Sequence, residues 1–402
     1  MDVFKRTQRE DTGTERVKCM IEVSLVKCES YDEKEVRTAL EAVLEPVGGL
    51  EWVRSGMTVV IKANLVAGMS PDKAVTTHPV LLCELTKMLK AKGATVVIGD
   101  SPGGIYSHAY VNRVYAAAGL KAAEECGAEL NQDFLQRDME NPDGKVLKNL
   151  TYTAYLDRAD AIIDFCKLKS HGMMGMSAAA KNMFGAIPGT IKPEYHFKYP
   201  KYEDFADMIV DIDELFKPRL SIVDAITGME GNGPTAGEPR YMGFLGASCS
   251  PHKLDRVCAE ILGLTSDSIP TLTAAINRGL TSEKVEDIAV NADIKDFLVP
   301  DFKHNATRSG LQFSGRGNNP VMKVASKLMG KILRSVPKVH KIECVACGVC
   351  AGICPAKAIT IENKKVSIDR EKCICCFCCQ EFCPKGAMVV HRPIGAKIAG
   401  KL

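Results

Sequence analysis

Short runs of β-branched and apolar residues alternate with stretches of helical periodicity over about the first 300 residues. The predicted strands are 21–26, 58–62, 94–99, 161–166, 220–223 and 243–247. Strands that alternate with helices usually pair in parallel, with helices covering both faces of the sheet. The pattern therefore predicts an α/β fold with a mainly parallel sheet for residues 17–300.

Two of the predicted helices have recognisable N-termini. The first follows Ser30 and Glu33, which are spaced as a capping box, and carries apolar residues at helical spacing through Val47. The second begins with Thr77 as its N-cap, keeps Pro79 in its first turn and ends near Gly93. Further helices are expected at 111–126, 203–216 and 253–262.

Composition places the chain among globular proteins of two or three domains. It has 402 residues, of which 46% are hydrophobic and 25% charged, and its net charge of +3 is too small to predict binding to nucleic acid. Residues 1–16 form a polar segment without the apolar core of a signal peptide, and no apolar run has membrane-spanning length. We therefore expect a cytoplasmic protein without a membrane span.

The distribution of the cysteines is more informative than their number. Ten of the 17 lie between Cys344 and Cys383, and the other seven are scattered over the first 258 residues. A secreted disulfide scaffold would be short and cysteine-rich throughout. This distribution instead favours metal or cluster ligation in a reducing cytoplasm.

The cysteine-rich segment, predicted as a domain over residues 342–392, contains the motif C-x2-C-x2-C-x3-C-P twice. In this motif the fourth cysteine of each run ligates the other cluster. The motif thus predicts two [4Fe–4S] clusters, one held by Cys344, Cys347, Cys350 and Cys383 and the other by Cys373, Cys376, Cys379 and Cys354.

Zinc is the alternative for these cysteines, but it commonly uses separated C-x2-C pairs without the trailing prolines. Cys375 and Cys378 lie outside the motif and are interpreted as spare thiols beside the cluster. Between the two runs, 358–361 and 366–368 are expected to form a β-hairpin.

Residues 301–341 are predicted to be a basic linker, and 393–402 a basic tail. From Lys303 to Lys341 the chain has nine Lys or Arg residues and no Asp or Glu. Lys323, Lys327, Lys331 and Arg334 share one face of a predicted amphipathic helix. This helix is interpreted as packing between domains, while docking of an acidic electron-donor protein on its basic face remains an alternative.

Polar residues follow the predicted parallel strands, where ligands bind in open α/β sheets. Lysines and amides near the glycine-rich segments at 172–175 and 231–237 are typical of a site for a small anion such as a phosphate or carboxylate. The expected binding residues are Lys62, Asn64, Asp100, Ser101, Lys167, Lys169, Lys181, Asn182, Glu230 and Asn232. Each has a plainer interpretation as a solvated, capping or turn residue, and convergence on one sheet edge favours the site.

The candidate catalytic groups come from the same strand ends. His171, or His196 in its place, would donate the proton that accompanies electron transfer, with Lys169 beside it and Asp224 or Asp100 as the orienting carboxylate. No P-loop motif is present, and Gly231, Gly233 and Gly237 have the wrong spacing for a dinucleotide site. The four methionines at 173, 174, 176 and 183 are interpreted as core residues.

Several ordered motifs resemble the family catalogued as domain of unknown function (DUF) 362. They are 61–64, 98–103, 167–171, 181–185 and 229–234, within a likeness that spans about residues 20–265. The resemblance implies a ferredoxin-like C-terminal module, which many members carry, and an origin among anaerobic bacteria and archaea. It supports the importance of the strand-end residues and implies no particular reaction.

These features predict an oxygen-sensitive oxidoreductase. Electrons from a low-potential carrier of the ferredoxin or flavodoxin type would reach a small anionic substrate in the α/β part. Two alternatives belong to other classes: a non-catalytic electron carrier that docks a partner enzyme, and a cluster-based redox sensor.

Overall fold

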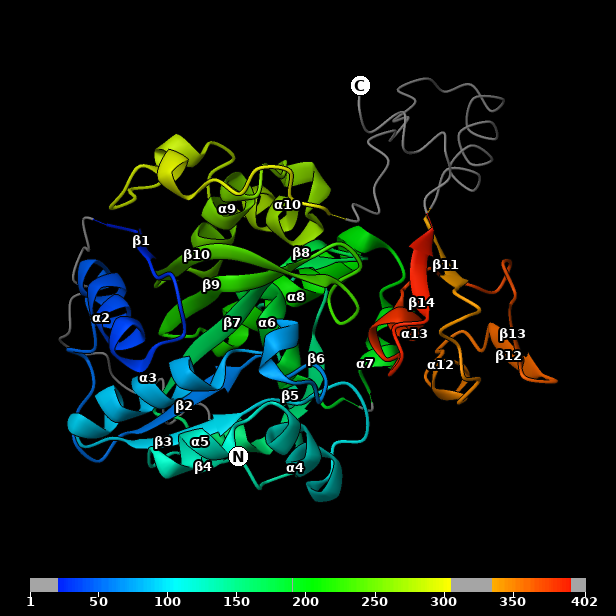
Figure 1. Cartoon of the computed structure of the whole chain (residues 1–402), viewed down its shortest axis with the longest axis horizontal. Coiled ribbons are helices and arrows are strands. Elements are labelled where there is room, and N and C mark those ends of the chain that lie inside the picture. The colour runs from blue at the N-terminus through cyan, green and yellow to red at the C-terminus, as the bar shows by residue number, and fades with distance from the viewer. Residues whose placement is uncertain (1–20, 190, 305–334, 392–402) are drawn as a thin grey trace.

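The computed structural model describes residues 21–189, 191–304 and 335–391 (Figure 1). The predicted tails at 1–16 and 393–402 lie outside the described residues. So does most of the predicted linker, including the basic amphipathic helix.

One eight-stranded sheet forms the centre of the α/β part. Its strand order is β1-β10-β9-β7-β2-β3-β4, with β8 paired to β7. Strands β9, β7, β2, β3 and β4 are parallel, while β10, β1 and β8 are antiparallel to their neighbours. The fold is therefore α/β with a mainly parallel centre, as the sequence predicts. The strands are β1 (Val23–Lys27), β2 (Thr58–Ala63), β3 (Thr95–Gly99), β4 (Glu129–Leu130), β7 (Ala161–His171), β8 (Gly175–Ser177), β9 (Leu220–Glu230) and β10 (Glu238–Ser248).

Two strands are longer than their apolar runs indicate. Strand β7 continues past Cys166 to His171, and β9 continues past Val223 to Glu230. Both remain buried along almost their whole length, because the lysines and aspartates of these extensions have polar partners inside the protein. The polar residues predicted to follow the strands therefore lie partly within them.

Helices cover both faces of the sheet (Figure 1). One face packs against α2 (Glu33–Leu44), α3 (Pro79–Ala91), α4 (His108–Ala117) and α5 (Lys121–Glu125). The other packs against α6 (Ala179–Asn182), α7 (Lys192–Lys198), α8 (Tyr202–Phe216), α9 (Pro251–Ile261) and α10 (Pro270–Asn277). The methionines at 173, 174, 176 and 183 are buried between the sheet and this second group of helices, as predicted.

Some helix ends differ from the prediction. Asp32, not Ser30, caps α2, because its Oδ1 accepts hydrogen bonds from the amides of Lys34 and Glu35. His78 caps α3, and Thr77 Oγ1 instead donates to the carbonyl of Phe165 at 2.7 Å. The helix expected at 111–126 is two helices, since Gly119 at φ +73° turns the chain between them.

The cysteine-rich region, defined here as residues 335–391, is a small α+β unit beside α7 (Figure 1). It contains two antiparallel strand pairs and two single-turn helices. The pairs are β11 (Val336–Val339) with β14 (Met388–His391) and β12 (Ile359–Glu362) with β13 (Lys365–Ile368); the helices are α12 (Val349–Gly352) and α13 (Cys378–Glu381). The predicted hairpin is present, and a further hairpin in the α/β part joins β5 (Gln136–Glu140) to β6 (Asn149–Thr153).

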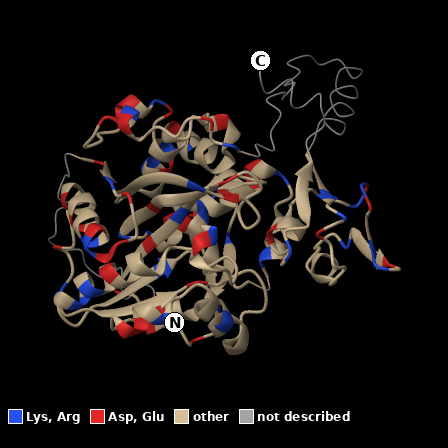
Figure 2. Ribbon diagram, viewed as in Figure 1, with Lys and Arg blue, Asp and Glu red and all other residues tan. Residues whose placement is uncertain are grey.

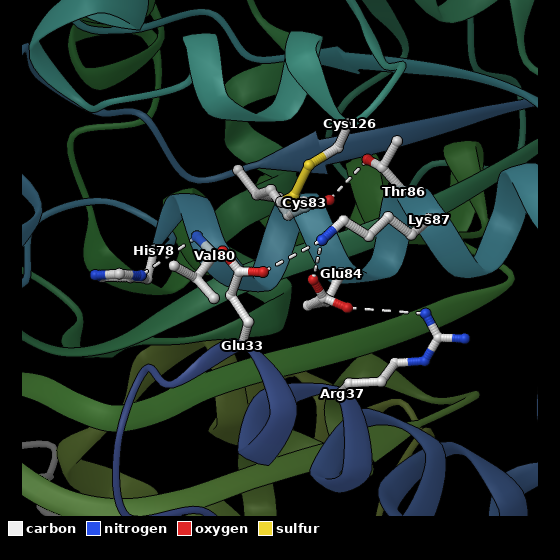
Figure 3. The surroundings of a disulfide bond; sticks show 10 residues. Glu33, Arg37, His78, Val80, Cys83, Glu84, Thr86, Lys87 and Cys126 are labelled. Atoms are coloured by element: carbon white, nitrogen blue, oxygen red, sulfur yellow. Dashed lines mark hydrogen bonds and ion pairs between the residues drawn. A yellow bond between two sulfur atoms is a disulfide. The ribbon is translucent and has the colours of Figure 1, made fainter.

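A disulfide joins α3 to the residue after α5. Cys83 and Cys126 are bonded across a sequence separation of 43, with their Cα atoms 5.6 Å apart (Figure 3). The bond ties two helices that cover the same face of the sheet. This pair was not foreseen, because residues so far apart in sequence give no spacing signal.

Removing this disulfide should lower the free energy of unfolding. A closed loop of this length corresponds to about 4 kcal/mol of chain entropy in the unfolded state. We expect Cys83→Ser/Cys126→Ser, measured by urea unfolding, to lose an amount of that order, and the exposed Cys249→Ser to lose little. Reductant should bring the native chain to the level of the double variant; a difference below about 1 kcal/mol would contradict a stabilising role.

Candidate functional site

Five of the predicted binding residues form one buried network at the carboxyl ends of β2, β3 and β7. Lys62 Nζ lies 2.7 Å from Asp100 Oδ1. Asn182 Oδ1 accepts hydrogen bonds from Asn64 Nδ2 at 2.9 Å and Lys62 Nζ at 3.3 Å. Lys169 Nζ in turn donates to Asn64 Oδ1 at 2.7 Å. The lysines at this edge thus find partners within the protein.

Two buried carboxylates position α6, which carries Lys181 and Asn182. Asp255 on α9 accepts hydrogen bonds from the amides of Ala179 and Ala180 at the start of α6. Asp164 Oδ1 on β7 accepts from Asn182 Nδ2 at 2.6 Å. Burial raises the pKa of Asp164 to about 8 and that of Asp255 to about 7, so both bind protons near neutral pH.

Lys167 and Asp224 belong to a second buried group. Lys167 Nζ lies 2.6 Å from Asp224 Oδ2, and Asp224 Oδ1 accepts from the Tyr31 hydroxyl at 2.9 Å. The His78 ring stacks on Tyr31 with ring centres 3.6 Å apart, and its backbone amide donates to Asp224. Asp224 is therefore occupied by a lysine, a tyrosine and a backbone amide, and in the described part of the chain it is not hydrogen-bonded to His171 or His196.

Asp100 and Ser101 are held in place at the end of β3. Asp100 Oδ2 accepts from the Leu65 amide at 2.7 Å, in addition to its contact with Lys62. Ser101 Oγ accepts from the Gly189 amide at 2.7 Å, and its carbonyl accepts from Lys192. The alternative orienting carboxylate, Asp100, is thus also used to hold the local backbone and a lysine.

The two candidate histidines each have a buried nitrogen without a hydrogen-bond partner among the described residues. His171 Nδ1 accepts from the amides of Met173 and Met174, both at 3.1 Å, which places the proton on the unpartnered Nε2. His196 stacks on Phe205 at 4.2 Å and leaves Nδ1 unpartnered. Such buried groups normally find partners, so they mark a place where a ligand or water can bind.

Lys181 lies near both histidines. Burial lowers the pKa of His171 well below its usual range and that of His196 to about 3, and the charge of Lys181 adds to both shifts. Within the described residues the Lys181 ammonium has no hydrogen bond or ion pair, and it lies 4.9 Å from the ring centre of Phe184. Lys181, His171 and His196 are called the open triad below.

Burial also lowers the pKa values of the lysines around the triad. The pKa of Lys169 falls to about 7 and that of Lys192 to about 8, while that of Lys181 falls below its usual range. The nearby carboxylate of Glu381 opposes the lowering of the pKa in all three lysines. Glu381 belongs to the cysteine-rich region, so that region lies close to the strand-end lysines.

The cysteine-rich region closes over the strand ends. Gln380 Nε2 donates to the carbonyls of Asn232 and Gly233, both at 2.9 Å, and Thr235 Oγ1 donates to the carbonyl of Glu381 at 3.1 Å. Glycines permit the close approach. A Cβ at Gly103 would lie 2.7 Å from the Phe382 ring, and one at Gly172 would lie 2.8 Å from Gln380 Oε1.

The remaining predicted residues lie near the two glycine-rich segments. Residues 172–175 turn the chain from β7 into the antiparallel β8, and α6, which carries Lys181 and Asn182, follows β8. Glu230 lies 3.2 Å from Lys303 Nζ and 4.0 Å from Arg240, while Asn232 contacts Gln380. Within the described residues, neither Glu230 nor Asn232 forms a hydrogen bond or ion pair with the open triad.

Four predicted cluster cysteines line one pocket of about 340 Å³ at the outer side of the cysteine-rich region. They are Cys344, Cys347, Cys350 and Cys383, called the outer set. Burial raises the pKa of the Cys350 thiol, and the other three sulfurs of the set contribute to this rise. The pocket is otherwise mostly apolar, with Val345, Val349 and Lys385 among its lining residues.

The other four cysteines, Cys354, Cys373, Cys376 and Cys379, are called the inner set. Burial raises the pKa of Cys379 well above its usual range, and the sulfurs of Cys376, Cys373 and Cys354 contribute, as does that of Cys350 from the outer set. The loop of this set packs into the core of the α/β part through the buried Phe377 and Cys375. Cys378 is fully buried beside Cys376, and its electrostatic effect reaches Lys181.

Cys166 is inert in this arrangement. Its side chain is fully buried, and burial raises its pKa well above the usual range despite the adjacent Lys167.

Comparison with known proteins identifies the family. A family model described as "Domain of unknown function (DUF362)" matches residues 59–260, which is half of the chain. The chain belongs to the DUF362 family. The match runs from β2 into α9 of this DUF362 protein and so includes the carboxyl ends of β2, β3, β7 and β9. Together with the clustered cysteines, the match is compatible with an iron–sulfur protein.

A curated relative supports the assignment. The DUF362 protein is 32% identical over 267 residues to the thylakoid-associated protein sll1697 of Synechocystis, covering 66% of this chain and 81% of the relative. None of the helices within the described ranges combines the length and apolar character needed to span a bilayer.

Two solved structures share a weaker likeness. The lactate racemase apoprotein of Thermoanaerobacterium thermosaccharolyticum is 14% identical with a TM-score of 0.38, covering 64% of this chain and 60% of the racemase. A Thermotoga maritima protein is 12% identical with a TM-score of 0.32, covering 54% and 55% of the two chains. Likenesses at this level do not bear on the function of the DUF362 protein.

Several residues at the site were not predicted. Tyr31 and Lys192 come from segments without a recognisable motif, and Glu381 is a spacer residue of the second cysteine motif; only the fold brings the three to the strand ends. Asp164 gave a weak signal, since it interrupts the apolar first half of β7, whereas Asp255 gave none, since α9 carries several other charged residues. A charged residue in such a position commonly has a specific buried partner.

Proposed function

We propose that this DUF362 protein is an iron–sulfur reductase with two [4Fe–4S] clusters, held by the outer and inner cysteine sets. The outer pocket supports the first site, because four thiols surround an apolar hollow. The grouped sulfurs around Cys379 support the second. Thiolates suit such clusters, which when bound supply single electrons.

Zinc suits these sites less well. Within the described residues, no group of three or more His, Cys, Asp or Glu side chains is placed to hold one metal ion. The ligands of a cube bind different irons and therefore stand farther apart than the four ligands of a single zinc ion. The trailing Pro355 and Pro384 of the two motifs point the same way.

The open triad is the proposed binding site for a small anion, and its unpartnered groups are the observation that carries the proposal. The Lys181 ammonium supplies the charge, and His171 Nε2–H donates a hydrogen bond. His171 stays neutral at pH 7 because burial lowers its pKa, so it orients the anion and is a weaker proton donor than the sequence predicts.

Lys169 is the proposed proton donor. Its pKa of about 7 suits proton transfer at neutral pH, and its fixed contacts to Asn64 and the Val75 carbonyl leave one N–H for the substrate. Each electron comes from a reduced carrier protein of the ferredoxin or flavodoxin type, which is oxidised by one electron. The substrate gains the electron and the Lys169 proton, and solvent then returns a proton to the lysine.

Anaerobic purification tests the cluster assignment directly. The protein should contain about eight irons and about eight sulfides per chain and give cubane EPR signals after dithionite. Mass spectrometry of the denatured protein would identify any small anion that co-purifies. About four irons per chain or fewer would rule out the two-cluster proposal.

Lys181→Met should remove the bound anion without removing iron. The variant keeps the apolar stem against Phe184 but loses the only triad charge, so we expect at least a tenfold loss of co-purifying anion and of any turnover. The exposed Lys201→Met is the matched control. Unchanged anion content in Lys181→Met would place the site elsewhere.

A non-catalytic electron carrier is the second candidate. Lys62, Lys167, Lys169 and Lys192 all bond to oxygen atoms of the protein itself, which favours a structural role for most of the predicted anion site. Electron transfer to a partner enzyme that survives in Lys181→Met and Lys169→Met would favour this candidate over the reductase.

A further inference from the structure

The two cysteine sets differ in their surroundings. The loop of the inner set is packed against the α/β part through Phe377, which is 2% exposed, and Cys375, which is 4% exposed. The outer set lines a pocket at the surface, where Cys347 is exposed. Electron transfer between proteins requires a close approach, and Cys347 of the outer set is the one exposed cysteine of the eight, whereas Cys379 of the inner set is buried.

Apolar side chains surround this accessible side. Ile342 is 88% exposed, Val345 61% and Val349 40%, and the last two line the outer pocket itself. Three of the eight large exposed apolar side chains of the described residues thus lie within eight positions of one another. Apolar residues clustered on a surface in this way commonly mark a protein interface.

Charge indicates the kind of partner. Residues 335–391 carry eight Lys or Arg against five Asp or Glu, and the blue segments outnumber the red ones there in Figure 2. Two of these lysines, Lys341 and Lys385, are exposed beside the apolar side chains, and Lys385 lines the pocket. Such a surface attracts an acidic protein and offers it an apolar contact.

We propose that the surface around Ile342, Val345, Val349, Lys341 and Lys385 is the docking site of a small acidic electron-carrier protein, which delivers electrons to the outer set. This proposal rests on the proposed function and identifies the class of protein that donates its electrons. In each encounter the carrier loses one electron and this chain gains one, with no bond made or broken. The basic face predicted in the linker lies outside the described residues, and this surface serves the same purpose.

Stopped-flow reduction of the loaded protein tests the proposal, with reduced flavodoxin as the acidic protein donor and dithionite as the small reductant. Ile342→Asp adds an opposing charge and lies outside the cysteine motif, and Lys385→Glu reverses a charge. We expect each to slow reduction by flavodoxin about tenfold and to leave reduction by dithionite within about twofold. Added salt should slow the flavodoxin reaction of the native chain.

The matched control is Leu135→Asp, at a side chain that is 66% exposed in the α/β part. Native flavodoxin rates in Ile342→Asp and Lys385→Glu would overturn the proposal, as would an equal loss in Leu135→Asp. Conversion of a dimer to a monomer by Ile342→Asp with no change in the flavodoxin rate would assign the surface to a second copy of this chain. The assay contains no substrate. If the docking proposal fails while dithionite still reduces the protein normally, the reductase proposal is therefore unaffected.

Discussion

Cys379→Ser is expected to lose about half of the iron and to loosen the attachment of the cysteine-rich region to the α/β part. Cys379 is buried, and the loop before it inserts Phe377 into the core beneath α7 and α8. Without the cluster this loop loses its covalent support, and release of Phe377 alone would remove about 2 kcal/mol of stabilisation.

Cys347→Ser is the matched comparison for this prediction. Cys347 is exposed and belongs to the outer set, away from the α/β core. This variant should also fall from about eight to about four irons per chain, yet keep the native thermal unfolding of the α/β part. Iron analysis, EPR and calorimetry under anaerobic conditions measure the three quantities. Equal thermal destabilisation by both variants would mean that the two sets are not distinguished by their packing.

The fold was predictable where burial produces a simple pattern. Strands β2 and β3 pair in parallel and read as nearly continuous apolar runs, so their positions follow from the sequence. The ends of β7 and β9 did not follow, because Lys167, Lys169 and Asp224 look like loop residues. Their burial depends on partners contributed by the residue after β2, the segment before α2 and the loop before α3, which no local pattern records.

The position of the candidate site was more predictable than the roles of its individual residues. The rule that ligands lie at the carboxyl ends of parallel strands brought Lys62, Asp100 and Asn182 together correctly. It does not distinguish a lysine whose charge is already matched, such as Lys62, from one that is open, such as Lys181. That distinction depends on the side-chain geometry around each ammonium group. The neutral state of His171 also depends on local geometry, since its Nδ1 accepts a backbone amide.

The buried lysines and aspartates also affect which of their neighbours are ionised. Lys62 and Asp100 form an almost fully buried ion pair. Lys62 also lowers the pKa of the nearby Asp164, but burial raises that pKa by more. Only one carboxylate is needed to match the charge of Lys62. The second, Asp164, is therefore expected to carry a proton at neutral pH.

Asp164→Asn should consequently stabilise the protein above about pH 4. The pKa of Asp164 is about 8 in the folded chain and near 4 when unfolded, so the unfolded chain releases its proton first as the pH rises. The native aspartate thus loses stability by about 1.4 kcal/mol per pH unit between these two values. Asparagine removes this loss, and its Oδ1 can still accept from Asn182 Nδ2. The advantage of the variant should grow up to about pH 8 and then stay constant.

Urea unfolding at several pH values between 5 and 9 measures this advantage, and Asp255→Asn provides the contrast. Asp255 also has a raised pKa, but both of its oxygens accept backbone amides at the start of α6. Its asparagine variant replaces one acceptor with a donor and should lose about 1 kcal/mol or more. If Asp164→Asn were instead destabilised at pH 8, Asp164 would be ionised in the folded chain and would serve, with Asp100, as a counter-charge for Lys62.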